Sequence, residues 1–324
     1  MIESGSTLYG ATGNGGTNID GNIFSFNTNN NTISQLYSFA GKPDGIGPEG
    51  SLVQSGNILY GMTQAGGNSG HGTIFGFDTS TKTESLVYSF GGEPNDGSAP
   101  YSSLIQSGPM LYGMTSAGGT SNSGAIVGFN TTSNTENVLY SFGSQLNDGN
   151  VPYGSLIASG NTLYGATAGG GKYGFGTLFS LDLTNDRETI LRSFNGSDGN
   201  GADSLILSGS ILYGVTVSSS PQGGTNGNIY SFDVNTDAYG ILHTFRGIDG
   251  GNDFGNLLLV GSTLYGMSEY GGLNNKGVVF ALTVPEPSCA SVAMLIATTL
   301  LARRRRPGGG STMNRPHPRL HPHR

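Results

Sequence analysis

The sequence predicts an all-β protein, a β-propeller of about five to six four-stranded blades. Two landmarks recur in step: a Leu-Tyr-Gly triplet every 49–52 residues, and a phenylalanine about 30 residues after it. The tyrosines are Tyr9, Tyr60, Tyr112, Tyr164, Tyr213 and Tyr265, and the phenylalanines are Phe39, Phe90, Phe142, Phe194 and Phe245. Each period also holds four short apolar runs bounded by Gly, Asn, Ser or Asp, as expected of strands. This pattern is typical of a propeller blade. A stacked β-solenoid is the less favoured interpretation, because the coils of a solenoid are usually shorter than this period.

The unit from 51 to 90 defines the expected strands, which are residues 51–54, 58–63, 73–78 and 84–90. The run 58–63 is apolar on both faces, which predicts an inner strand buried between two sheets. Its glycine is expected to let a neighbouring sheet approach closely. The first unit, from Thr7 to Phe39, and the last unit each show three strands. Because the chain begins inside a unit, we expect residues upstream, and pairing of the first and last pieces would close the ring.

Charge separates the repeats from the C-terminal segment. Residues 1–284 contain 7 Lys and Arg against 20 Asp and Glu, whereas residues 285–324 contain 7 against Glu286 alone. The acidic repeats argue against a nucleic-acid partner, because binding to phosphates depends on basic groups. The single cysteine, Cys289, excludes an intrachain disulfide. No signal peptide is visible at the N-terminus.

The C-terminal segment begins where the repeat stops, after Leu282. An apolar run from Cys289 to Ala302 predicts a short hydrophobic helix, and the arginines that follow it would stay on the cytoplasmic side of a membrane. The segment contains, in order, Pro285, Glu286, Pro287, the apolar run, and Arg303, Arg304, Arg305 and Arg306.

This order resembles a PEP-CTERM sorting signal. The resemblance implies a bacterial protein that is held transiently in the inner membrane and processed by an exosortase. Such proteins are delivered to the cell surface or extracellular matrix, often alongside exopolysaccharide. We therefore expect a repeat domain at 1–283 with a truncated first unit, a sorting and transient membrane segment at 284–306, and a disordered basic tail at 307–324.

The repeat itself also resembles a known family. Leu-Tyr-Gly-Met-Thr, Ala-Gly-Gly and Gly-Thr-Ile-Phe follow one another within residues 59–75. This succession is similar to the GloVer tandem repeat of "choice-of-anchor" bacterial surface proteins, which combine it with different C-terminal anchors. The resemblance implies location and architecture, and it implies no particular chemistry.

Two recurring polar motifs could carry chemistry, and each has a structural interpretation. Asp-Gly follows the fourth strand of five units, at Asp44, Asp96, Asp148, Asp198 and Asp249. These pairs are typical of turns, and a ring of Ca²⁺ sites is the weaker alternative because calcium loops need several close carboxylates. The Gly-Gly pairs are expected to be turns, since no helix follows them to bind phosphate. His71 and His243 lie in different units, so we expect neither a metal site nor a cofactor.

A sugar-stacking surface could be formed by four loop tyrosines, Tyr101, Tyr153, Tyr173 and Tyr270. No Ser/His/Asp set is recognisable, so the sequence favours a binding or structural role, with a glycan or a protein as ligand, over catalysis. The alternatives are a secreted polysaccharide lyase or hydrolase and a purely structural matrix protein. The expected partners are the exosortase and an exopolysaccharide or surface protein.

Overall fold

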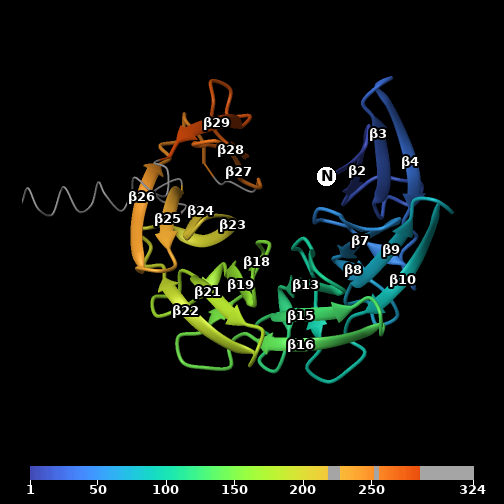
Figure 1. The fold of residues 1–324 in the computed structure, drawn as a ribbon, viewed down its shortest axis with the longest axis horizontal. Coiled ribbons are helices and arrows are strands. Elements are labelled where there is room, and N and C mark those ends of the chain that lie inside the picture. The colour runs from blue at the N-terminus through green and yellow to red at the C-terminus, as the bar shows by residue number, and fades with distance from the viewer. Residues whose placement is uncertain (218–226, 252–254, 285–324) are drawn as a thin grey trace, which may run out of the picture. The chain divides into compact units, whose positions relative to one another are not determined.

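The computed structural model describes residues 1–217, 227–251 and 255–284. Every element in these residues is a β-strand. Six antiparallel sheets of three or four strands, here called blades, follow one another around a common axis (Figure 1), and three two-stranded sheets lie between blades. The predicted propeller is therefore confirmed, with six blades. This part of the chain contains no helix that is long and apolar enough to cross a membrane. The predicted C-terminal helix and the sorting signal lie outside the described residues.

The first three blades each contain four strands in chain order. Blade 1 comprises β1 (Ile2–Ser4), β2 (Thr7–Thr12), β3 (Asn22–Asn27) and β4 (Thr32–Ser38). Blade 2 comprises β6 (Val53–Ser55), β7 (Ile58–Thr63), β9 (Thr73–Asp78) and β10 (Thr83–Ser89). Blade 3 comprises β12 (Ile105–Ser107), β13 (Met110–Thr115), β15 (Ala125–Asn130) and β16 (Thr135–Ser141).

Blades 4 and 5 repeat this order, and the described part of blade 6 contains three strands. Blade 4 comprises β18 (Ile157–Ser159), β19 (Thr162–Ala166), β21 (Thr177–Asp182) and β22 (Arg187–Ser193). Blade 5 comprises β23 (Asn200–Ser208), β24 (Ile211–Val217), β25 (Asn228–Asp233) and β26 (Ala238–Thr244). Blade 6 comprises β27 (Leu258–Val260), β28 (Thr263–Ser268) and β29 (Val278–Thr283).

One detail of the strand prediction was wrong. The first unit has four strands, because β1 pairs with β2 through a hairpin whose turn contains Gly5 at φ 61°. The sequence hides β1 because Ile2 is its only apolar residue. The expected strands of the unit 51–90 otherwise match β6, β7, β9 and β10 within two residues.

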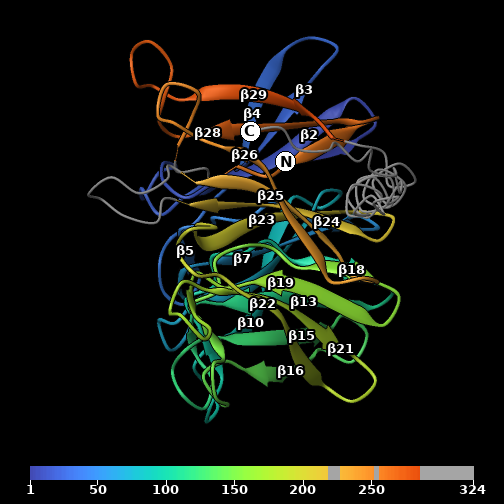
Figure 2. The same cartoon turned by 90° about the vertical axis from the view of Figure 1, so that its left-hand side faces the viewer.

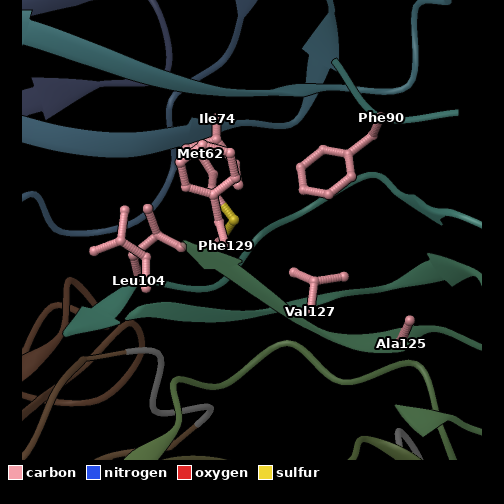
Figure 3. Packing of buried hydrophobic residues seen from close by; sticks show 8 residues of the cluster. Met62, Ile74, Phe90, Leu104, Ala125, Val127 and Phe129 are labelled. Atoms are coloured by element: carbon pink, nitrogen blue, oxygen red, sulfur yellow. The ribbon is translucent and has the colours of Figure 1, made fainter. Parts of the chain in front are cut away.

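Neighbouring blades are held together by apolar side chains between their faces, and the turned view shows the blades side by side (Figure 2). We call the face toward the preceding blade the leading face and the opposite one the trailing face. Between blades 2 and 3, Met62 and Ile74 of the trailing face pack with Leu104, Val127 and Phe129 of the leading face (Figure 3). Burial of such side chains contributes about 1.5–3 kcal/mol each, so this repeated interface stabilises the contact between neighbouring blades.

The glycine of Leu-Tyr-Gly serves mainly its own blade, which corrects the expected role. A Cβ on Gly61 would lie 2.4 Å from the ring of Phe75, its cross-strand partner on β9. The glycine thus leaves room for an aromatic ring inside the leading face. Only at Gly113, where the partner is the smaller Val127, does Met62 of the preceding blade fill the space, 2.9 Å from such a Cβ.

Short two-residue strands add a second link between blades. β5 (Gly45–Ile46) pairs with β8 (Ala65–Gly66), β11 (Gly97–Ser98) with β14 (Ala117–Gly118), and β17 (Gly149–Asn150) with β20 (Gly169–Gly170). The first member follows one blade and the second lies in the loop of the next. In the second link, Gly119 N–H also donates to the carbonyl of Asp96 at 2.9 Å. The Asp-Gly and Gly-Gly motifs therefore join consecutive repeats to each other, in addition to forming turns.

Candidate functional site

The segments that enter successive blades converge on a cavity of about 480 Å³. Three of these segments share the sequence Pro-x-x-Ser-Leu, beginning at Pro48, Pro100 and Pro152. The leucine enters the blade core, where Leu52, Leu104 and Leu156 are each no more than 4% exposed. Anchoring by this leucine places the serine three residues after the proline at the inner end of the blade, facing the cavity.

A ladder of serine hydroxyls connects these segments around the axis. The backbone N–H of Ser51 donates to Oγ of Ser103 at 2.8 Å, and the N–H of Ser103 donates to Oγ of Ser155 at 3.2 Å. In blade 5, Oγ of Ser204 accepts the N–H of Leu257 at 2.9 Å. The ladder fixes the inner ends of the blades and lines the cavity with hydroxyl groups that can donate and accept.

The residue after each proline breaks the pseudo-symmetry of the cavity. It is Glu49 in the first segment, Tyr101 in the second and Tyr153 in the third, and all three line the cavity. The two tyrosine rings meet edge to face, with centroids 5.3 Å apart. Tyr153 is 45% exposed. One side of the cavity thus offers two aromatic rings beside a carboxylate.

Tyr101 of this pair is held in place by a hydrogen bond. The side-chain amide of Gln64 donates to the hydroxyl of Tyr101. Burial raises the pKa of Tyr101, and the neighbouring Tyr153 and Glu49 raise it further. Tyr101 therefore stays a neutral phenol at physiological pH, and its ring is oriented before any ligand binds.

The other two tyrosines of the expected surface lie elsewhere. Tyr173 is 51% exposed in the loop between β20 and β21, where the ammonium of Lys172 stacks 5.2 Å from its ring centroid. Tyr270 is 44% exposed in blade 6, where its N–H bonds the carbonyl of Gly251. Neither lines the cavity. The structure thus brings Tyr101 and Tyr153 together and separates them from Tyr173 and Tyr270.

The recurring aspartates are occupied by groups of their own blade. Oδ2 of Asp96 accepts the hydroxyl of Tyr88 at 3.0 Å and the N–H of Gly91 at 2.6 Å. Asp44 and Asp148 have the same pair of donor types. In blade 4 the tyrosine is replaced by Arg192, which pairs with Asp198, and in blade 5 by His243, which pairs with Asp249. These carboxylates pin the loop after the fourth strand to that strand.

A glutamate from the next blade faces three of these pairs. They are Glu84, Glu136 and Glu188, and burial followed by the charge of the nearby aspartate raises the pKa of each to about 7. At the fourth interface Arg192 takes the place of the tyrosine, and its guanidinium lies 3.5 Å from the ring centroid of Tyr239. At this interface arginine thus replaces the tyrosine, and a tyrosine replaces the glutamate that faces it.

His71 and His243 each make a local side-chain contact. Nδ1 of His71 lies 2.9 Å from Oγ of Ser98, and Nε2 of His243 lies 3.1 Å from Asp249. Within residues 1–217, 227–251 and 255–284, His, Cys, Asp and Glu side chains form no group of three that could hold a metal ion.

Sequence reasoning missed the serine ladder and Glu49. The signal was available, because Pro-x-x-Ser-Leu recurs at a spacing of 52 residues. Because serine and proline are common in turns, the motif by itself predicts only a turn, and the fold shows that these turns share one axis.

Comparison with known proteins identifies the repeat and the fold. Residues 1–152 and 144–299 match the repeat that defines the Gloeobacter/Verrucomicrobia repeat family. No curated protein matches the chain.

Among solved structures, an oligogalacturonate lyase in complex with manganese has a TM-score of 0.53 and 14% identity, over 86% of this chain and 71% of the lyase. TolB from Acinetobacter baumannii has a TM-score of 0.51 and 15% identity, over 86% of this chain and 61% of TolB. At such identities the likeness shows the propeller fold alone, because propellers host many unrelated functions.

Proposed function

We propose, given that the chain belongs to the Gloeobacter/Verrucomicrobia repeat family, that it is an exported surface or matrix propeller that binds a glycan in its axial cavity. The observation that carries the proposal is the edge-to-face pair of Tyr101 and Tyr153 at a cavity whose lining also includes four serines and Glu49. Aromatic rings cover the apolar faces of a sugar, and hydroxyls and a carboxylate match its hydroxyl groups.

A neutral glycan fits this site better than a polyanionic one. Residues 1–284 carry 20 acidic against 7 basic side chains, and Glu49 stands beside the tyrosine pair. The field of such a domain repels a polyuronate and leaves a neutral chain unaffected. The cavity of about 480 Å³ falls in the size range of small-ligand sites, which corresponds to a few sugar residues.

The binding test uses the full chain and a panel of neutral oligosaccharides of four to six sugars, with a polyuronate as contrast. Isothermal titration calorimetry measures the affinity of the wild type and of every variant, so the readout does not depend on the tyrosines that the variants remove. Tyr101→Ala and Tyr153→Ala should each weaken binding of the responsive sugar at least tenfold, or about 1.4 kcal/mol. Tyr173→Ala, a matched exposed tyrosine outside the cavity, should leave affinity within twofold.

Two results would change the functional class. Cleavage of any of these glycans, seen as new reducing ends or unsaturated products, would assign an enzyme. No response to the whole panel would favour a structural matrix protein without a specific ligand.

Export rests on the C-terminal segment, whose residues lie outside the described structure. The order of Pro285, Glu286, Pro287, an apolar run and four arginines supports PEP-CTERM sorting and transient inner-membrane anchoring with exosortase processing. Fractionation should find the chain first in the inner membrane and then at the cell surface. Replacing residues 303–306 by serine should abolish the membrane-held form, whereas serine at Arg315 and Arg319 should not. A chain confined to the cytoplasm would contradict this part of the proposal.

A further inference from the structure

The trailing face of blade 6 exposes apolar side chains whose equivalents are buried in other blades. Val279 is 77% exposed, whereas its equivalents Ile23, Ile74, Ile126, Leu178 and Ile229 are each at most 1% exposed. Met267 is 58% exposed, and its equivalents Met62 and Met114 are 3% and 0% exposed. At each of the five interfaces within the chain, a trailing face of this composition is covered by the leading face of the next blade.

The first blade carries the complementary half of that interface. Its leading face presents Leu8, Phe24 and Phe26, the same residue types in the same register as Leu59, Phe75 and Phe77 of blade 2. The three blade 2 residues are at most 1% exposed in their contact with blade 1. The three blade 1 residues are only partly buried. Figure 1 shows blades 1 and 6 at the two ends of an arc of blades, on opposite sides of a gap.

We propose that the trailing face of blade 6 binds the leading face of blade 1 of a second copy of this chain. The contact would repeat the geometry of the internal interfaces: Tyr265, Met267 and Val279 of one copy would cover Leu8, Phe24 and Phe26 of the next. Because the two surfaces differ, the association is head to tail and each copy keeps one free face of each kind until a ring closes. The oligomer is independent of what the axial cavity binds.

An internal contact provides the site for a cross-link. Nε2 of Gln106 in blade 3 donates to Oγ of Ser55 in blade 2 at 2.9 Å. The equivalent positions at the two free faces are Glu3 in blade 1 and Val260 in blade 6, both exposed. A cysteine at each should therefore come within reach of a short bis-maleimide, and cysteines at positions 55 and 106 form the positive control.

The cross-linking test starts from the full chain with Cys289, its only cysteine, replaced by serine. A mixture of the Glu3→Cys chain with the Val260→Cys chain should yield a covalent heterodimer, and neither chain alone should cross-link to itself. The chain with both substitutions distinguishes the alternative. If at high dilution it gives only an internally cross-linked monomer, the ring closes on itself and the proposal is overturned.

Mass measurement by light scattering gives the second test. The mean mass should rise with concentration, and Met267→Asp should weaken the association at least tenfold. Val279→Lys provides a second disruption at a 77% exposed position, in case the first disturbs folding. Leu146→Asp, at an 88% exposed loop position in blade 3, is the control and should leave the mass unchanged. A constant monomer mass, or an oligomer that both face variants leave intact, would refute the proposal.

Discussion

Glu188 should make the propeller less stable as the pH rises from 5 to 8. Its side chain lies at the interface of blades 3 and 4, where Gln145 Nε2 donates to one carboxylate oxygen at 2.8 Å. The other oxygen, Oε1, is buried without a hydrogen-bond partner. Burial, followed by the charge of Asp148, raises the pKa of Glu188 to about 7.

The sign follows from comparing the folded and unfolded chains. Below pH 4.5 the carboxyl is protonated in both, so its contribution to folding is fully present. Between pH 4.5 and about 7 only the unfolded chain ionises, and the free energy of unfolding falls. A shift of this size corresponds to about 3 kcal/mol at most, and solvent screening reduces it, so we expect about 1–3 kcal/mol.

Glu188→Gln removes the ionisation and keeps the oxygen that accepts from Gln145. The variant should exceed the wild type in stability by about 1–3 kcal/mol at pH 8 and match it within about 0.5 kcal/mol at pH 4. Urea unfolding at both pH values measures the difference, with the exposed Glu93→Gln as control. A variant that is equally or less stable than the wild type at pH 8, or a gain that is the same at both pH values, would refute the reasoning.

Three further substitutions test contacts between blades and within a blade by urea unfolding. Leu111→Ala, in the buried core between blades 2 and 3, should cost about 2–5 kcal/mol; a loss below 1 kcal/mol would contradict that interface. Gly118→Ala places a Cβ 2.3 Å from the carbonyl of Asp96 and should cost clearly more than Gly108→Ala, which has similar left-handed backbone but open space. Equal losses would contradict the inter-blade clamp. Arg192→Ala leaves a buried carboxylate unpaired and should cost about 3–5 kcal/mol, whereas a neutral effect would show that water replaces the ion pair.

The repeat architecture was predictable because each unit repeats the same local rules. The strands of one blade can be predicted from its own apolar runs, its turn residues and the constant period, and the neighbouring blade need not be known. The same locality explains the errors. β1 was missed because a three-residue strand with one apolar residue has no periodicity to read, and the role of Gly61 was misassigned because its neighbour Phe75 is a cross-strand partner 14 residues away.

The candidate site was only partly predictable, because a cavity is a property of several blades together. Tyr101 and Tyr153 were among the expected ligand-facing residues, but nothing in the sequence separates them from Tyr173 and Tyr270. Their proximity depends on the angle between blades 3 and 4, which the packing of the blade faces determines. Pairs of substitutions, such as Arg192 with Tyr239 in place of tyrosine with glutamate, likewise become meaningful only once the interface is known.

The most direct test of the account is a crystal structure of the full chain with the best-binding neutral oligosaccharide. The account predicts a sugar ring against Tyr101 and Tyr153, with its hydroxyl groups within hydrogen-bond distance of Glu49 and the serine ladder. A sugar bound instead at Tyr173, at Tyr270 or on the outer strands, with the axial cavity empty, would contradict it.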